Sequence, residues 1–184
     1  IKKNFFEKYY NYLNSLKNIT QKERDLIRNK YYENILTENK IGEKIIVDKL
    51  PLHIIELGFI KNIFPESKII LAMRHPCDVI TSCFFSSFKM NDAMINFLDL
   101  DDSINFYNLV FELFETYETE LSLEYHTIKY EDLLDSFEKQ MQLLLNYIGL
   151  DYENELENYY LTAQNRDKIS TPSYNQVVNP LYKT

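Results

Sequence analysis

Apolar residues along the chain follow two spacings, and together these predict strands alternating with helices. The clearest strand is the apolar run from Ile69 to Met73, which stops at Arg74 and is followed by Pro76. Five apolar residues bounded by a charge and a proline are typical of a parallel strand buried on both faces. Shorter apolar segments predict two more strands, at residues 45–47 and 124–129.

Helical spacing accounts for most of the remaining chain. Residues 1–40 predict two helices broken near 18–20, where Thr20 and Glu23 form a capping-box pattern. Further helices are expected over residues 53–63, 78–88, 103–121, 136–148 and 152–165, and Gly149 is expected to end the 136–148 helix. Strands that alternate with helices predict an α/β fold of three layers, α/β/α, around a mostly parallel sheet.

Composition limits the classes of function. The 184 residues suffice for one domain with a core. A net charge of -8 argues against a nucleic-acid partner, and no stretch approaches the roughly 20 apolar residues of a membrane span. The only cysteines, Cys77 and Cys83, lack a histidine or cysteine cluster nearby, so we expect no metal site. Their spacing of six in a helical region points them to different faces, so we expect no disulfide between them. These features predict a cytoplasmic location.

Arg74 and Ser82 are the first candidates for a binding site. Pro76 disfavours a helical conformation at His75, which places Arg74 at the carboxyl end of a strand, where ligands bind in open α/β sheets. Asp78 is expected to cap the next helix, with Ser82 in its first turns. A guanidinium and a hydroxyl that converge there predict a phosphate site. The alternative is an arginine in a surface ion pair and a serine merely tolerated in a helix.

Several short motifs follow one another along the chain: Asp48-Lys49-Leu50-Pro51-Leu52, Phe64-Pro65-Glu66-Ser67-Lys68-Ile69-Ile70, Arg74-His75-Pro76-Cys77-Asp78, Ser82, Tyr130-Glu131-Asp132-Leu133 and Ser173-Tyr174-Asn175-Gln176-Val177. Together they resemble the nucleotide-dependent sulfotransferases, above all the bacterial branch often fused behind tetratricopeptide repeats, and also the protein-tyrosine sulfotransferases. Each motif alone is weak, but their order and spacing extend over residues 24–184. The resemblance implies a fold related to the P-loop nucleotide kinases.

The resemblance also implies a reaction: a sulfuryl group moves from 3'-phosphoadenosine 5'-phosphosulfate (PAPS) to an acceptor hydroxyl or amine, leaving 3'-phosphoadenosine 5'-phosphate (PAP). Arg74 and Ser82 match the pair that binds the donor's 3'-phosphate. Ser173 resembles a position that reaches the donor phosphates, and Gln176 would orient its loop. Lys49 resembles a lysine near the sulfate, where it can stabilise developing negative charge. No metal is implied.

The acceptor must lose a proton, which calls for a base within hydrogen-bond reach. His53, four residues beyond Lys49, is the candidate for this role. His75 is expected to belong to the phosphate-side turn, and His126 to be a packed or surface residue of a strand. The carboxylates of Glu131 and Asp132 are expected to be structural, capping the helix that follows them.

The family has an amino-terminal phosphate loop, but none of the three glycines of the chain lies in such a loop. We therefore expect residues 1–184 to be a single sulfotransferase-like domain without that segment, inactive as a free-standing chain, with a possible upstream tetratricopeptide-repeat domain. Two other interpretations stay open: a P-loop kinase relative that uses ATP, and a non-catalytic module that binds a partner through its tyrosine-rich helices. The acceptor could be a carbohydrate, a peptide or a small molecule.

Overall fold

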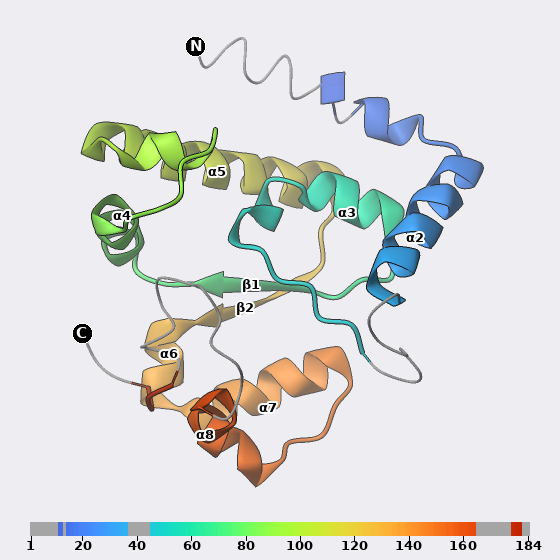
Figure 1. The fold of residues 1–184 in the computed structure, drawn as a ribbon. Coiled ribbons are helices and arrows are strands. Elements are labelled where there is room, and N and C mark those ends of the chain that lie inside the picture. Colours follow the sequence, from blue (N-terminus) through green and yellow to red (C-terminus); the bar gives the residue numbers. More distant parts are fainter. Residues whose placement is uncertain (1–10, 13, 37–44, 165–177, 182–184) are drawn as a thin grey trace. The chain divides into compact units, whose positions relative to one another are not determined.

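The computed structural model describes residues 11–12, 14–36, 45–164 and 178–181 of the chain (Figure 1). The α-helices are α2 (Gln21–Leu36), α3 (Leu57–Ile63), α4 (Pro76–Phe85), α5 (Leu100–Leu121), α6 (Tyr130–Asp135), α7 (Phe137–Ile148) and α8 (Tyr159–Gln164). The 3₁₀ turns are η1 (Pro51–Ile54), η2 (Met94–Phe97) and η3 (Asn154–Asn158), and the strands are β1 (Ile69–Met73) and β2 (Tyr125–Lys129).

The chain divides into two compact units. The first unit consists of Ile1–Ser67 and Val110–Leu123, and the second consists of Lys68–Leu109 and Glu124–Thr184. Both strands therefore belong to the second unit, while α2, α3 and the end of α5 belong to the first.

The two strands of the second unit run in parallel, paired from Ile69 with Tyr125 to Met73 with Lys129. This confirms the expected α/β class with parallel strand pairing. The expectation that β1 is buried on both faces is wrong, because burial alternates along it and Ile70 is 42% exposed. An unbroken apolar run is compatible with a strand, but it does not reveal which face is covered.

Tyr147 of α7 connects that helix to both strands through its ring and its hydroxyl. Its ring stacks on His126 of β2, with 5.4 Å between ring centroids, and its hydroxyl accepts a hydrogen bond from the backbone N–H of Ile69 at 3.3 Å. The ammonium group of Lys68 lies 5.1 Å from the centre of the same ring. α7 ends as expected at Gly149, which adopts a φ of 84° and donates its N–H to the carbonyl of Leu145.

Helix α2 begins where the capping-box pattern places it. The backbone N–H of Glu23 donates to the hydroxyl of Thr20 at 3.3 Å, and the Glu23 carboxylate accepts the backbone N–H of Thr20 at 2.8 Å. These reciprocal bonds satisfy donors that the first helical turn would leave unpaired. The break near residues 18–20 is confirmed, since residues 14–17 are helical and Gln21 starts the next helix.

The core of the first unit centres on Tyr117, which is fully buried and donates its hydroxyl to the carbonyl of Ile55. Helix α2 is tied to α3 by Arg24, whose Nε donates to the side-chain oxygen of Asn62 at 2.9 Å. The buried apolar side chains of this unit are Leu16, Leu57, Ile63, Leu113, Phe114, Tyr117 and Leu123.

Several expected elements differ from the structure. Residues 45–47 are not a strand, and Ile45 and Val47 are 60% and 83% exposed; a strand needs a hydrogen-bonding neighbour, which none of the described segments provides for them. The helix expected over 53–63 is split into η1 and α3, and the one over 152–165 into η3 and α8. The short helix α6 was not expected. Among the described residues, no helix has the length and apolarity needed to cross a membrane.

Candidate functional site

Arg74 lies where the sequence placed it, directly after the last residue of β1. The chain turns there because His75 has an extended backbone (φ -51°, ψ 128°) and Pro76 occupies the first position of α4. His75 is also the N-cap of α4, since its Nδ1 accepts the backbone N–H of Cys77 at 3.3 Å. The expectation that Asp78 caps this helix is therefore wrong, and His75 belongs to the turn as expected.

The guanidinium of Arg74 is half-buried and contacts Asp78 and Tyr130. Its Nε donates to the carboxylate of Asp78 at 3.2 Å, and its central carbon lies 4.9 Å from the centre of the Tyr130 ring. A cation over an aromatic face is attracted by the ring's quadrupole. The ion pair that the sequence left open as an alternative is thus present, and its Asp78 member lies on the helix that also carries Ser82.

Ser82 lies one helical turn after Asp78 on α4. Asp78 and Ser82 are four residues apart on one helix, so their side chains are neighbours on the same face. Because Asp78 contacts Arg74, the Ser82 hydroxyl lies one helical turn beyond that contact. Ser82 is exposed. A phosphate bound to Arg74 would have to share the guanidinium with the carboxylate of Asp78.

Glu131 connects the ends of the two strands. Its carboxylate accepts the backbone N–H of His75 at 2.8 Å. Hydrogen bonds from the backbone N–H groups of Glu131 and His75, together with the charge of Arg74, hold the pKa of the Glu131 carboxyl below its usual value. Lys129, at the N-cap position of α6, makes no side-chain cap, whereas the Glu131 carboxylate accepts a backbone N–H of the first turn, its own.

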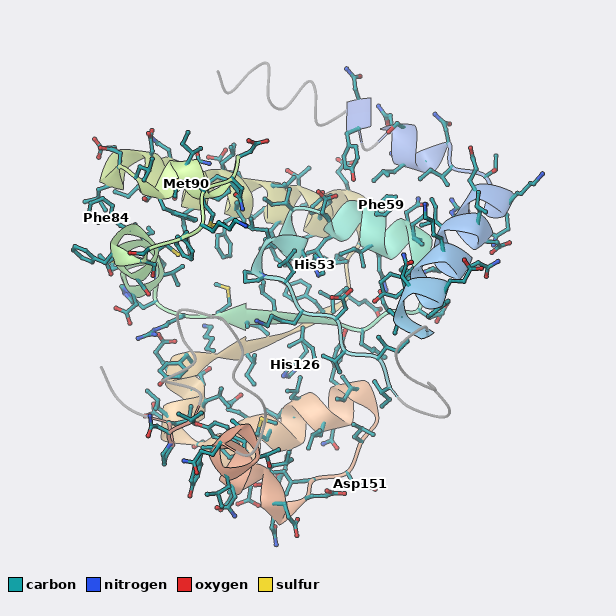
Figure 2. All side chains as sticks on the ribbon, in the orientation of Figure 1. His53, Phe59, Phe84, Met90, His126 and Asp151 are labelled. Atoms are coloured by element: carbon teal, nitrogen blue, oxygen red, sulfur yellow. The ribbon has the colours of Figure 1, made fainter. Side chains whose placement is uncertain are left out.

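The first unit holds the two expected catalytic residues, Lys49 and His53. Lys49 is exposed and precedes η1 in an extended segment. The Nδ1 atom of His53 lies 3.9 Å from one carboxylate oxygen of Asp48, whose other oxygen accepts the hydroxyl of Tyr31 at 2.9 Å. Figure 2 labels His53 on this turn. The Asp48 carboxylate therefore lies near one ring nitrogen of His53, at a distance longer than a hydrogen bond.

Burial raises the pKa of Tyr31 to about 12, and the hydrogen bond to Asp48 adds to the increase. Tyr31 therefore stays a neutral donor at neutral pH and keeps Asp48 in place beside His53. His126, which Figure 2 labels, packs on Tyr147 within the second unit, in agreement with the expectation of a packed or surface residue. Ser173 and Gln176 lie outside the described residues.

The sequence did not predict that Tyr130 would contact Arg74 or that Asp48 would lie near His53. Register could have identified Tyr130: both it and Arg74 directly follow the last pair of two parallel strands, Met73 with Lys129. In the sequence, Asp48 was noted only as part of a motif; its position five residues before His53 is the signal that could have identified it. Within the part of the chain that the structure describes, no cluster of three histidine, cysteine or acidic residues could hold a metal ion.

Comparison with known proteins identifies the family of the chain. A family model described as "Sulfotransferase family" matches residues 6–154, which is most of the chain. The chain belongs to the sulfotransferase family. This agrees with the α/β fold and with the resemblance that the short motifs indicated.

The sulfotransferase chain is also similar to an uncharacterized protein of Aquifex aeolicus (strain VF5), with 26% identity over 140 residues. That match covers 76% of this chain but only 18% of the relative, so the chain spans less than a fifth of the relative's length.

Proposed function

We propose that this chain is the donor-binding part of a sulfotransferase that uses PAPS and transfers its sulfuryl group to an acceptor hydroxyl or amine. Arg74 and Ser82 bind the 3'-phosphate of the donor. Ser173, with Gln176 orienting its loop, contributes from the carboxyl-terminal side. PAPS supplies the activated sulfuryl group, and PAP is the product.

The observation that carries the proposal is the placement of Arg74. Its guanidinium lies at the carboxyl end of a parallel strand, and α4 presents the Ser82 hydroxyl one turn beyond the Asp78 contact. An arginine held in this way against Tyr130 is restricted in orientation before any ligand arrives. Restriction of this kind lowers the entropic cost of binding a phosphate. A 3'-phosphate is also the group that distinguishes PAPS from ATP.

His53 and Lys49 have the chemical roles in this proposal. When the acceptor oxygen or nitrogen bonds to sulfur, the bond from sulfur to the bridging oxygen breaks and the acceptor proton must leave. His53 accepts that proton, and the Asp48 carboxylate, 3.9 Å from its Nδ1, favours the positive charge that the ring then carries. Lys49 stabilises the negative charge that develops on the transferred group and the bridging oxygen.

Calorimetric titration tests the donor site. PAP should bind more tightly than adenosine 5'-phosphate, which differs only by lacking the 3'-phosphate, and more tightly than ADP, whose extra phosphate is at the 5' end. The variant Arg74→Ala should lose about ten- to a hundredfold in PAP affinity, because a charge-assisted hydrogen bond contributes about 1.5–3 kcal/mol. Its affinity for adenosine 5'-phosphate should stay unchanged.

Lys68→Ala is the matched control, because it removes a positive charge next to the opposite end of the same strand, where Lys68 lies over Tyr147. A similar loss of affinity in this variant would show that PAP senses only the general charge of the protein. Tighter binding of ADP than of PAP would contradict the proposal and favour the kinase interpretation. Equal, weak binding of all three nucleotides would favour a non-catalytic module.

A further inference from the structure

The residues that follow the two strands meet because of the strand register. Met73 pairs with Lys129 as the last residues of β1 and β2, so Arg74 and Tyr130 occupy equivalent positions just beyond the pair. The 4.9 Å contact between the Arg74 guanidinium and the Tyr130 ring follows from this register. Glu131 is the next residue after Tyr130, and its side chain reaches back across the gap to β1.

The hydrogen bond of Glu131 acts on a single peptide unit. Its carboxylate accepts the N–H of His75, which is the nitrogen of the peptide bond that joins Arg74 to His75. The turn that contains this peptide is short, because His75 is the only residue between Arg74 and the start of α4 at Pro76. Fixing the peptide therefore fixes the direction in which the Arg74 side chain leaves the strand.

The electrostatics favour the ionised form of the Glu131 side chain. The pKa of the carboxyl is lowered first by the backbone N–H groups of Glu131 and His75 and further by the charge of Arg74. At neutral pH the carboxylate is thus a good acceptor for the His75 N–H. Asp132, the next residue, is exposed and gives a comparison on the same helix.

We propose that Glu131 is a positioning residue for Arg74: its carboxylate holds the peptide that follows the arginine and so aims the guanidinium at the phosphate of the donor. Glu131 does not itself contact the ligand in this role. The identity of the ligand rests on the proposed function, whereas the effect on Arg74 exists without any nucleotide.

The first experiment measures the order of Arg74 directly in the nucleotide-free protein. The chain has only four arginines, so the Nε–H signals in a ¹⁵N spectrum are few and can be assigned by substitution. In Glu131→Ala, the Arg74 Nε–H signal should shift, and its heteronuclear NOE should fall toward the value of a mobile side chain. Glu131→Gln retains an oxygen acceptor for the His75 N–H and should leave the signal near its original position. Asp132→Ala should leave it unchanged.

The second experiment measures binding with the same variants. Glu131→Ala should weaken PAP binding about tenfold and leave the affinity for adenosine 5'-phosphate unchanged, whereas Glu131→Gln should stay within about threefold of the wild type. Circular dichroism and thermal unfolding establish that each variant is folded. Rescue by glutamine is the result that a mere loss of negative charge would not give.

The two experiments separate the two proposals. If Arg74 becomes mobile in Glu131→Ala but the wild type binds PAP no better than adenosine 5'-phosphate, the positioning role stands and the donor site fails. An unchanged Arg74 signal in Glu131→Ala would overturn the positioning role, whatever the nucleotide binding. An equal effect of Asp132→Ala would also overturn it, because the cause would then be the charge of α6 and not the hydrogen bond.

Discussion

The ring of Tyr117 lies directly against the backbone of Gly58. A Cβ atom placed on Gly58 would be 2.5 Å from Cε1 of Tyr117 and 3.2 Å from both Cδ1 and Cζ. The ring has little freedom to withdraw, because it is fully buried and its hydroxyl donates to the carbonyl of Ile55. The absence of a side chain at Gly58 is therefore what allows α3 and the end of α5 to approach each other.

The variant Gly58→Ala should destabilise the protein by about 1–3 kcal/mol, the usual cost of overpacking a core. The sign of this stability change is informative, because within a helix alanine is otherwise more stabilising than glycine by about 0.5–1 kcal/mol. Urea unfolding followed by circular dichroism measures the change.

Tyr117→Leu provides the matching partner for Gly58→Ala in a double-mutant cycle. If the clash with the ring is the cause, the two substitutions should be coupled by more than about 0.5 kcal/mol, since the leucine variant removes the atoms that a Cβ would meet. Additive effects, or a Gly58→Ala variant as stable as the wild type, would show that the ring can move aside.

Thr20→Ala should lower the free energy of unfolding by about 1 kcal/mol, because it removes the N-cap hydroxyl of α2. Thr119→Ala in α5 is the control, since the Thr119 hydroxyl bonds to the carbonyl of Glu115 inside its own helix. That substitution should change stability by less than about 0.5 kcal/mol. Equal effects of the two would rule out a specific contribution from the cap.

The contribution of Glu23, the second residue of the capping box, to the free energy of unfolding should depend on pH. Hydrogen bonds from the side chain and the backbone of Thr20 lower the pKa of the Glu23 carboxyl. A lowered pKa gives stability that is present above the unfolded value, about 4.3, and is lost as the pH falls through the folded value. The wild type should therefore be more stable than Glu23→Gln at pH 7, and the difference should shrink below about pH 4. Urea unfolding across this range measures it; a constant difference would contradict the role of ionisation.

Ser82→Ala should reduce PAP affinity severalfold, the effect of losing one hydroxyl contact of about 0.5–1.5 kcal/mol. Thr81→Ala is a close control, because it removes the neighbouring hydroxyl, which donates to the carbonyl of Cys77 at 2.6 Å within α4. Titration of both variants with PAP should show a loss only for Ser82→Ala. A larger loss for Thr81→Ala would exclude Ser82 from the phosphate site.

The raised pKa of Tyr31 should make the free energy of unfolding fall at alkaline pH. Its pKa is raised to about 12, mainly by burial and then by Asp48, so the folded state retains a proton that the unfolded chain loses near pH 10. The resulting stability is complete below pH 10 and declines as the pH rises from there toward 12. Wild type and Tyr31→Phe should therefore differ most in the slope of their unfolding free energies between about pH 10 and 12. Parallel slopes would contradict the assignment.

Local sequence determined the parts of this protein that local chemistry can specify. The capping box at Thr20 and Glu23, the stop at Gly149 and the strand from Ile69 to Met73 were all predicted correctly, because each depends on residues within a few positions. The position of Arg74 after β1 was predicted for the same reason, since Pro76 forces the chain to turn. The short motifs indicated the sulfotransferase family in the same way, because each consists of neighbouring residues in a fixed order.

Only the tertiary structure decided which distant residues surround these positions. Pairing of β1 with β2 brought Tyr130 to Arg74 and Glu131 to His75, across 56 residues for the latter pair. The apolar segment at 45–47 predicted a strand but is exposed and unassigned, because strand formation depends on a neighbour that local sequence does not encode. Hydrogen bonds between distant segments are decided by register and packing, and these depend on the whole fold.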